Sequence, residues 1–75
     1  MSITAINARN QFVGQVKRIK RGDVVSEVEV DTGHGIITSI VSTSSIDTLD
    51  LKPGADVVAL FKSTEVALAT YSPLE

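Results

Sequence analysis

A chain of 75 residues has room for one domain, 1–75, and a domain of this size buries only about 60% of the surface that its unfolded chain exposes. The absence of cysteine excludes disulfides and most structural metal sites, which leaves self-association as the expected supplement to a small core. A net charge of −2 argues against a polyanion such as DNA as a partner, although a small anion can still bind where a few cations and amide groups converge. No segment approaches the roughly 20 apolar residues of a membrane span, and residues 1–4 lack the features of a secretory signal, so we expect a cytoplasmic protein.

The first predicted strand spans residues 10–20. Phe12, Gly14 and Val16 share one phase of a strand, whereas Ile19 falls on the other phase. A change of phase within one strand indicates a bulge or a twist.

The next two strands are predicted to form a hairpin. In residues 24–31, valines and one serine at the even positions alternate mainly with acidic residues, as in a strand with one buried and one solvated face. The two glycines and the polar side chains of residues 31–35 favour a turn. Residues 36–41 should therefore fold back as a third strand.

A serine-rich tract, residues 42–45, separates the third strand from a predicted helical turn. This tract offers no apolar side chain for a core, but Ser44 or Ser45 can accept hydrogen bonds from the free amides of a helix start, and Asp47 follows Ser44 at the spacing of a capping box. We therefore predict one short helix over residues 45–49.

The last third of the chain predicts two more strands. Proline and glycine in residues 52–54 make a turn that leads into a fourth strand over residues 57–62. A kink at residues 63–65 precedes a fifth, short strand over residues 66–70, where apolar side chains alternate again. Residues 72–73, serine and proline, indicate a frayed tail.

Five short strands with one helical turn between the third and the fourth predict an all-β fold, a small five-stranded, partly closed barrel of the oligonucleotide/oligosaccharide-binding (OB) type. Closure limits the open edges that a flat sheet would expose. A five-stranded sandwich, or a half-barrel completed by a partner subunit, would give the same one-dimensional pattern, so the sequence leaves these alternatives open.

The residue types give little support for catalysis. Covalent catalysis needs an activated nucleophile beside a base, but the chain has no cysteine, and its one histidine, His34, lies between two glycines in a predicted turn. We interpret His34 as an exposed turn residue. The carboxylates of Glu27, Glu29 and Asp31 fit the solvated face of a strand better than a cation site. We expect no enzyme activity, no catalytic residue, no catalytic cofactor and no directly bound metal cation.

Four of the seven basic residues form a basic cluster, which consists of Lys17, Arg18, Lys20 and Arg21. Strand alternation sends their side chains to different faces, and aromatic residues, which serve as stacking platforms for bases, make up only 4% of the chain. We interpret the basic cluster as a solvated hairpin end rather than a nucleic-acid surface.

Three polar clusters stand at the ends of predicted strands rather than within them: residues 7–11, 42–45 and 62–64. Arg9 in the first cluster offers a planar fork that matches paired oxygens, Lys62 in the third offers a point charge, and the serines and threonines offer small hydroxyls. Taken singly, serines before a helix are usually caps and Lys-Ser-Thr is usually a turn. Together, these donors can replace the water around a tetrahedral oxyanion.

At these residues the chain resembles the molbindin, or Mop, family, which is related to the TOBE domains of molybdate-transport ATPases and molybdate-responsive regulators. Residues 7–11, Asn-Ala-Arg-Asn-Gln, resemble the family's Ser-Ala-Arg-Asn-Gln and are the most specific element, because Arg-Asn-Gln has no ordinary turn or core explanation. Residues 38–42, 51–54 and 58–66 also resemble the family in order and separation, so the match runs nearly end to end. Asn7 departs from the family, where serine is common; asparagine still donates through its amide but is longer.

The resemblance implies an OB-like barrel that assembles as a hexamer, a trimer of dimers, and holds molybdate or tungstate between subunits for intracellular storage, buffering and homeostasis. Selectivity over sulfate would rest on cavity size. Carried over residue by residue, the implied oxyanion contacts are Arg9, Ser42, Ser45, Lys62 and Ser63, together with Asn7 at the position of the family's serine. Strand-end segments of one chain are too short to surround an anion, so we expect two chains to close the pocket.

Two other functions remain open from the sequence. An OB barrel with a basic cluster can serve as a single-stranded nucleic-acid-binding module, although we expect neither a nucleic-acid nor a membrane partner. A ligand-free assembly or regulatory domain, such as one cut from a larger transporter or regulator, would have the same fold. Salt-dependent retention of single-stranded DNA tests the first function, and ligand-dependent melting tests the second.

Overall fold

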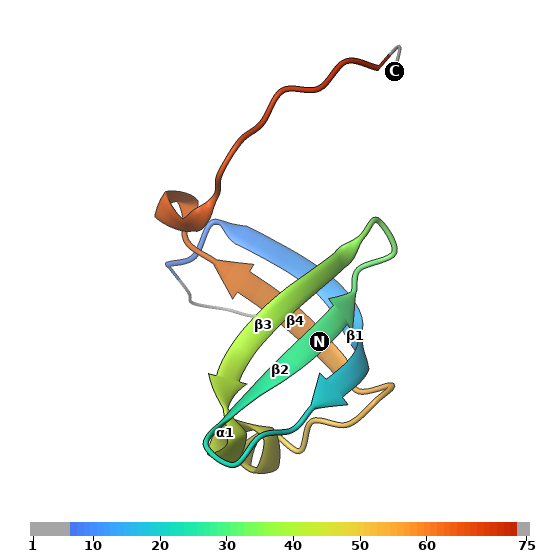
Figure 1. The fold of residues 1–75 in the computed structure, drawn as a ribbon, viewed down its shortest axis with the longest axis vertical. Helices are drawn as coiled ribbons and strands as arrows, with labels where there is room; N and C mark the ends of the chain where they lie inside the picture. Colours follow the sequence, from blue (N-terminus) through green and yellow to red (C-terminus); the bar gives the residue numbers. More distant parts are fainter. Residues whose placement is uncertain (1–6, 74–75) are drawn as a thin grey trace.

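The computed structural model describes residues 7–73, so the outer ends of the predicted domain 1–75, residues 1–6 and 74–75, lie outside the described residues. Within residues 7–73 the elements follow in the order β1 (Asn10–Lys20), β2 (Val25–Asp31), β3 (Ile36–Ser42), α1 (Thr43–Thr48), β4 (Asp56–Phe61) and a 3-10 helix, η1 (Ser63–Glu65). The strands form one curled sheet, with α1 at one end and η1 at the other (Figure 1). The predicted all-β class with one short helix is confirmed.

The long strand β1 organises the sheet. The strand order is β3–β2–β1–β4 and all pairings are antiparallel. β1 pairs with β4 along its first half and with β2 along its second half, so it joins both ends of the molecule. The register against β2 shifts between Val16 and Arg18, which confirms the predicted bulge. Because a bulge increases the local twist, β1 can follow the curl of the sheet and keep both partners.

β2 and β3 form the predicted hairpin. Gly33 in the connecting turn has a φ of 84°, in the left-handed region that glycine adopts without strain. The Asp31 carboxylate accepts the Gly33 N–H at 2.8 Å, and the Thr32 hydroxyl donates to the Gly35 carbonyl at 2.8 Å. His34 is exposed in this turn, as expected.

The core is small and lies where β1, β2 and α1 pack together. It consists of Val16 from β1, Val28 and Val30 from β2, and Ile46 from α1, each at most 5% exposed. The alternation predicted for residues 24–31 is thus confirmed for its buried face, although Val24 itself is 77% exposed. Burial of Ile46 fixes α1 against the end of the sheet.

The helix begins earlier than the sequence suggested. It spans Thr43–Thr48 rather than 45–49, and its N-cap is Ser42, whose hydroxyl accepts the Ser45 N–H at 3.2 Å. The proposed caps at Ser44 and Ser45 are therefore wrong. Asp47 does not complete a capping box; it pairs with Arg21. The helix starts early because Thr43 is buried. The sequence did not indicate this burial, because the tract offers no apolar side chain for a core.

The predicted fifth strand over residues 66–70 does not form within the single chain. After η1, residues 66–73 run away from the sheet as an extended tail (Figure 1). Leu68 is 93% exposed and Tyr71 is 86% exposed. A strand exists only where a neighbour satisfies its backbone donors and acceptors, and no strand of residues 7–73 pairs with the tail.

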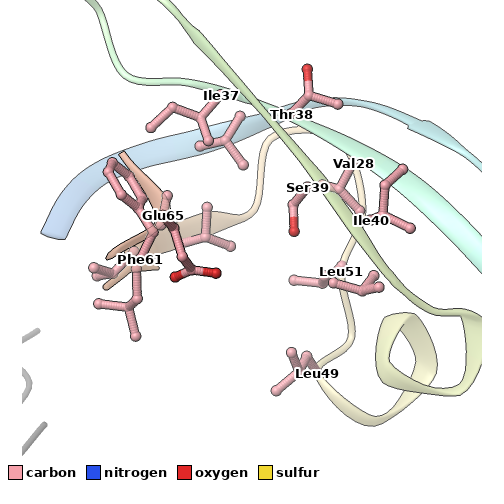
Figure 2. A pocket seen from close by; sticks show the side chains of 15 residues that line it. Val28, Ile37, Thr38, Ser39, Ile40, Leu49, Leu51, Phe61 and Glu65 are labelled. Carbon is pink, nitrogen blue, oxygen red and sulfur yellow. The ribbon is translucent and has the colours of Figure 1, made fainter. Parts of the chain in front are cut away.

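The curled sheet leaves a trough between its two outer strands, β3 and β4. This trough has a volume of about 560 Å³ and a mainly apolar lining that includes Val28, Ile37, Leu49, Leu51, Val57 and Phe61. Phe61 and Glu65 lie at one end of it, and Leu49 and Leu51 lie toward α1 (Figure 2). The described residues thus form an open, four-stranded half-barrel rather than a sandwich.

Candidate functional site

One group of predicted site residues lies where β1 begins and β4 ends. Asn10 pairs with Phe61 across these strands, so Arg9, one residue before Asn10, and Lys62, one residue after Phe61, are neighbours at the strand ends. The side chains of Asn7, Arg9, Lys62 and Ser63 are all exposed. We call Asn7, Arg9, Lys62 and Ser63 the cationic group.

The turn that follows β4 is closed by a residue that sequence reasoning did not single out, Glu65. Its carboxylate accepts the backbone N–H of Lys62 at 2.6 Å, and its own N–H donates to the Lys62 carbonyl at 2.9 Å. These reciprocal bonds fix Lys62 and Ser63 at the start of η1. The Lys-x-x-Glu spacing was a usable signal, because a glutamate three residues after a helix start commonly reaches back to the first free amide.

The other group of predicted site residues, Ser42 and Ser45, lies at the junction of β3 and α1 and includes a further hydroxyl from Ser44. The Ser42 and Ser45 hydroxyl oxygens are 2.6 Å apart, and those of Ser42 and Ser44 are 3.2 Å apart. We call Ser42, Ser44 and Ser45 the serine group. As an N-cap, Ser42 uses an oxygen lone pair to accept the Ser45 N–H, so its O–H remains able to donate.

Proton counting shows what the serine group can offer an anion. Each of the two contacts between hydroxyl oxygens uses one hydroxyl proton, so one of the three protons is free in the ligand-free arrangement. An oxyanion only accepts hydrogen bonds. When the hydroxyls rotate toward it, the two protons that are used between hydroxyls can be donated to the anion instead. The serine group is therefore a set of small donors held together before a ligand arrives.

Buried polar contacts anchor the serine group to the β1–β2 turn. The Thr43 hydroxyl donates to the Gly22 carbonyl at 2.8 Å and contacts the Ser26 hydroxyl at 2.7 Å, and the Thr43 N–H donates to the Val24 carbonyl at 2.8 Å. Sequence reasoning missed Ser26 and Thr43. The signal was Ser26 itself, a polar residue in phase with buried valines, which requires a hydrogen-bonding partner.

An ion pair supplies a second link between the β1–β2 turn and α1. Two guanidinium nitrogens of Arg21 donate to the two Asp47 carboxylate oxygens at 3.2 and 3.0 Å. These hydrogen bonds, and secondly the attraction between the opposite charges, lower the pKa of the Asp47 carboxyl and raise the pKa of Arg21. The pair lies in solvent, so it orients α1 more than it stabilises the fold.

The two groups lie at opposite ends of the molecule. Ser42 pairs with Val25, where β2 follows the end of β1, whereas Arg9 precedes the start of β1. β1 has 11 residues, and at about 3.3 Å per residue a strand of that length extends over roughly 35 Å. Figure 1 shows α1 and η1 at opposite ends of the sheet. One chain therefore does not gather the predicted ligands around one anion.

The basic cluster is partly neutralised within the protein. Arg18 donates to Glu29 at 2.9 Å across the β1–β2 pair, and Arg21 is bound to Asp47. Phe12 and Phe61 stack on each other, with ring centroids 5.8 Å apart. These contacts favour the interpretation of the basic cluster as a solvated strand end over a nucleic-acid surface.

Residues 7–73 contain neither a cluster of metal ligands nor a membrane-spanning helix. Across this part of the chain, no three His, Asp or Glu side chains come together in a way that would hold a metal ion. No helix in the described part of the chain is both long and apolar enough to cross a membrane.

Comparison with known proteins finds the same small fold and a family for this chain. The chain belongs to the TOBE domain family, which matches residues 6–68, and within it to the Mop group of molybdenum-pterin-binding proteins. Molybdenum-pterin-binding protein 1 of Clostridium pasteurianum is 42% identical over 65 residues, which cover 85% of this chain and 96% of that protein. The molybdenum transport protein ModE of Azotobacter vinelandii is 40% identical over 67 residues, which cover 88% of this chain but only 25% of ModE.

Solved structures agree with the fold. A molybdate-binding protein from Sporomusa ovata superposes with a TM-score of 0.84 at 31% identity, covering 89% of this chain and all of that chain. MopII from Clostridium pasteurianum superposes with a TM-score of 0.81 at 42% identity, covering 88% of this chain and all of that chain. The resemblance seen in residues 7–11 is thus confirmed at the level of the family.

Proposed function

We propose that this protein binds molybdate or tungstate at the seams between copies of itself and stores and buffers these oxyanions in the cytoplasm. The observation that carries the proposal is the separation of the cationic group from the serine group at the two ends of β1. A lone chain offers each group to solvent, whereas a second copy can bring its serine group to the cationic group of the first.

The chemistry of the two groups suits a tetrahedral dianion. Arg9 and Lys62 supply charge, and the serine group supplies small donors that reach separate oxygens. Neither group contains a carboxylate, and the neighbouring Glu65 carboxylate is engaged by the Lys62 N–H. This arrangement suits an ion that carries no proton, because protonated phosphate needs an acceptor. Molybdate and tungstate are larger than sulfate but share its shape and charge, so the spacing of the donors would set selectivity.

The names of the relatives support this assignment of ligand. The comparisons include molybdenum-pterin-binding proteins from Clostridium pasteurianum and a molybdate-binding protein from Sporomusa ovata. Another solved relative, ModG, is described as a cytoplasmic molybdate-binding protein. These names describe binding proteins, which agrees with the expectation of a non-catalytic role.

Equilibrium dialysis against molybdate, tungstate and sulfate tests the proposal directly. Arg9→Ala and Lys62→Ala each remove a charged donor and should lower molybdate affinity about tenfold or more. Lys17→Ala is a matched control, because it removes an exposed lysine from the middle of β1, away from both groups. Unchanged affinity in both site variants would place the pocket elsewhere, and equal binding of sulfate would remove the selectivity claim.

The tail offers a route to assembly. Residues 66–70 alternate as a strand would, and their apolar side chains are exposed. The trough between β3 and β4 is apolar and open. We propose that the tail of one copy lies in the trough of a second copy as the fifth strand and thereby closes the OB-like barrel. Exchange in both directions gives a dimer, and three such dimers give the proposed hexamer.

Native mass measurements test this assembly. A hexamer has six times the mass of the 8.0 kDa chain. Leu68→Lys places a charge on the tail face that would enter the trough, and we expect it to reduce the native mass to that of the monomer. Ala69→Lys changes the opposite face of the same segment and should leave the mass unchanged. Retention of the full mass by Leu68→Lys would contradict the exchange.

Melting curves separate storage from a ligand-free assembly module. A ligand that binds only the assembled form stabilises it by RT ln(1 + [L]/Kd), or about 2.7 kcal/mol at a hundredfold excess over Kd. We expect molybdate to raise the melting temperature, whereas a ligand-free module would melt at the same temperature with and without molybdate.

A further inference from the structure

The buried hydroxyls of Ser26 and Thr43 form a closed ring with the backbone of Gly22. The Gly22 N–H donates to the Ser26 hydroxyl at 3.2 Å, the two hydroxyl oxygens are 2.7 Å apart, and the Thr43 hydroxyl oxygen is 2.8 Å from the Gly22 carbonyl. We call these three residues the hydroxyl ring. Ser26 is 3% exposed and Thr43 is 7% exposed, so these bonds are shielded from water.

The direction of every bond in the hydroxyl ring follows from elimination. A carbonyl oxygen only accepts, so the single hydroxyl proton of Thr43 goes to Gly22. Ser26 must then donate its proton to Thr43, and its own oxygen accepts the Gly22 N–H. Each hydroxyl donates once and accepts once, in a continuous cycle. Such chains of hydrogen bonds strengthen one another in a low-dielectric interior.

The backbone around Gly22 is closely packed. A Cβ on Gly22 would collide with the Val25 carbonyl oxygen, so the backbone on either side of the ring is in close contact. Thr43 follows Ser42 directly in the chain, and its N–H extends the β2–β3 ladder to the Val24 carbonyl. The backbone at Ser42 is thus held by strand pairing at its own position and by the hydroxyl ring at the next.

We propose that the hydroxyl ring is a positioning element, which fixes the separation and orientation of the Ser42 and Ser45 hydroxyls and so sets the preference for molybdate over the smaller sulfate. This inference rests on the proposed function. The ring does not touch the ligand. It acts through Thr43, the first residue of α1, on the N-cap before it and on Ser45 two residues after it.

The preference between two anions distinguishes positioning from simple stability. A variant that only lowers the folded fraction weakens the binding of both anions by the same factor, because apparent affinity scales with the fraction of protein that can bind. A variant that lets the two hydroxyls approach or separate changes the fit to each anion differently. The ratio of molybdate to sulfate affinity is therefore the decisive quantity.

Thr43→Val tests the proposal, because it keeps the shape of the side chain and removes the hydroxyl. We expect molybdate affinity of the full-length protein to fall about tenfold and the ratio of molybdate to sulfate affinity to fall about threefold or more. Thr43→Ser keeps the hydroxyl and should keep the ratio within about twofold of the parent protein. Thr48→Val makes the same change at an exposed position of α1 and is the matched control. Sulfate is measured by displacement of bound molybdate at constant ionic strength.

Two further measurements make the outcome decisive. If Thr43→Val does not fold, Ser26→Ala opens the ring at its other hydroxyl by removing one oxygen atom and should lower the ratio in the same way. Amide hydrogen exchange of Ser45, whose N–H donates to Ser42, should be faster in either ring variant than in Thr48→Val. An unchanged ratio in the ring variants overturns the positioning role even if both anions bind more weakly. If the parent protein binds no molybdate, the proposed function fails, and unchanged Ser45 exchange would then overturn the positioning role separately.

Discussion

The two ends of the curled sheet are built in different ways. At the α1 end, the hydroxyl ring, the Arg21–Asp47 ion pair and the buried side chain of Ile46 hold the serine group in place. At the η1 end, the cationic group is exposed and the turn is closed mainly by the reciprocal bonds between Lys62 and Glu65, with the extended tail beyond it. The first end is held by contacts within one chain, whereas the second end would be completed by another chain in the proposed assembly.

This difference suits an anion site shared between copies. Small hydroxyls discriminate by distance, so they need a rigid support. Arginine and lysine have long flexible side chains and supply charge, which tolerates a looser support. The burial of each end therefore predicts how strongly substitutions at that end disturb folding.

The largest difference between the ends should appear in unfolding experiments. Ile46→Ala removes a buried side chain from the core and should lower the free energy of unfolding by about 2–5 kcal/mol. Thr64→Ala in η1 changes an exposed side chain and should alter it by no more than about 0.5 kcal/mol. Urea unfolding followed by far-UV circular dichroism measures both values.

If Thr64→Ala lowered the free energy of unfolding as much as Ile46→Ala does, η1 would also be part of the cooperative core. The two ends of the sheet would then not differ in stability. The native mass of each variant should be determined first, since loss of assembly would add to either value.

A smaller effect is expected at the joint between the two ends, Gly14. A Cβ there would lie 2.5 Å from the Asp31 carbonyl oxygen and 2.8 Å from a methyl carbon of Val30. Because the backbone oxygen cannot rotate away, Gly14→Ala should force β1 and β2 apart and cost about 1–3 kcal/mol. Val13→Ala, at a neighbouring position that is 70% exposed, is the control. Thermal or urea unfolding measures both, and equal stability of Gly14→Ala and the parent protein would show that β1 moves freely at this point.

Local patterns in the sequence predicted most of the fold. Alternation over residues 24–31, the break of phase in β1 and the glycines of the hairpin turn each arise from contacts within one or two strands, and the structure confirms them. The start of α1 was misplaced because Ser42, Ser44 and Ser45 are equally good caps by local criteria. The tertiary bonds of Thr43 to Gly22, Ser26 and Val24 select Ser42.

The candidate site was predictable as residue types but not as an arrangement. Arg9, Lys62 and the serines stand out because they occupy strand ends, yet nothing in their spacing reveals that β1 separates them. The arrangement of the tail was likewise not predictable from the sequence. Residues 66–70 have the alternation of a strand, but pattern alone does not state whether the pairing partner lies in the same chain. That information resides in the sheet, whose trough between β3 and β4 is open.

The smallest expected effect concerns the Arg21–Asp47 ion pair, and it isolates the electrostatic part of the α1 end. The pKa of Asp47 is lowered in the folded protein, so its ionised form favours folding. This contribution is fully present above the unfolded pKa of about 3.9 and is lost as the pH falls through the lower, folded value. Asp47→Asn should therefore shift the urea midpoint slightly at pH 7, and the difference from the parent protein should shrink as the pH falls below about 4.

Salt provides the control for this last prediction. The two side chains are 52% and 67% exposed, so about 1 M sodium chloride should reduce the pH 7 difference by screening. A difference that persists unchanged in acid and in salt would mean that Asp47 stabilises α1 through the shape of its side chain rather than its charge. In that case the hydroxyl ring and Ile46 would account for the rigidity of the α1 end without help from the ion pair, and the contrast with the η1 end would rest on burial alone.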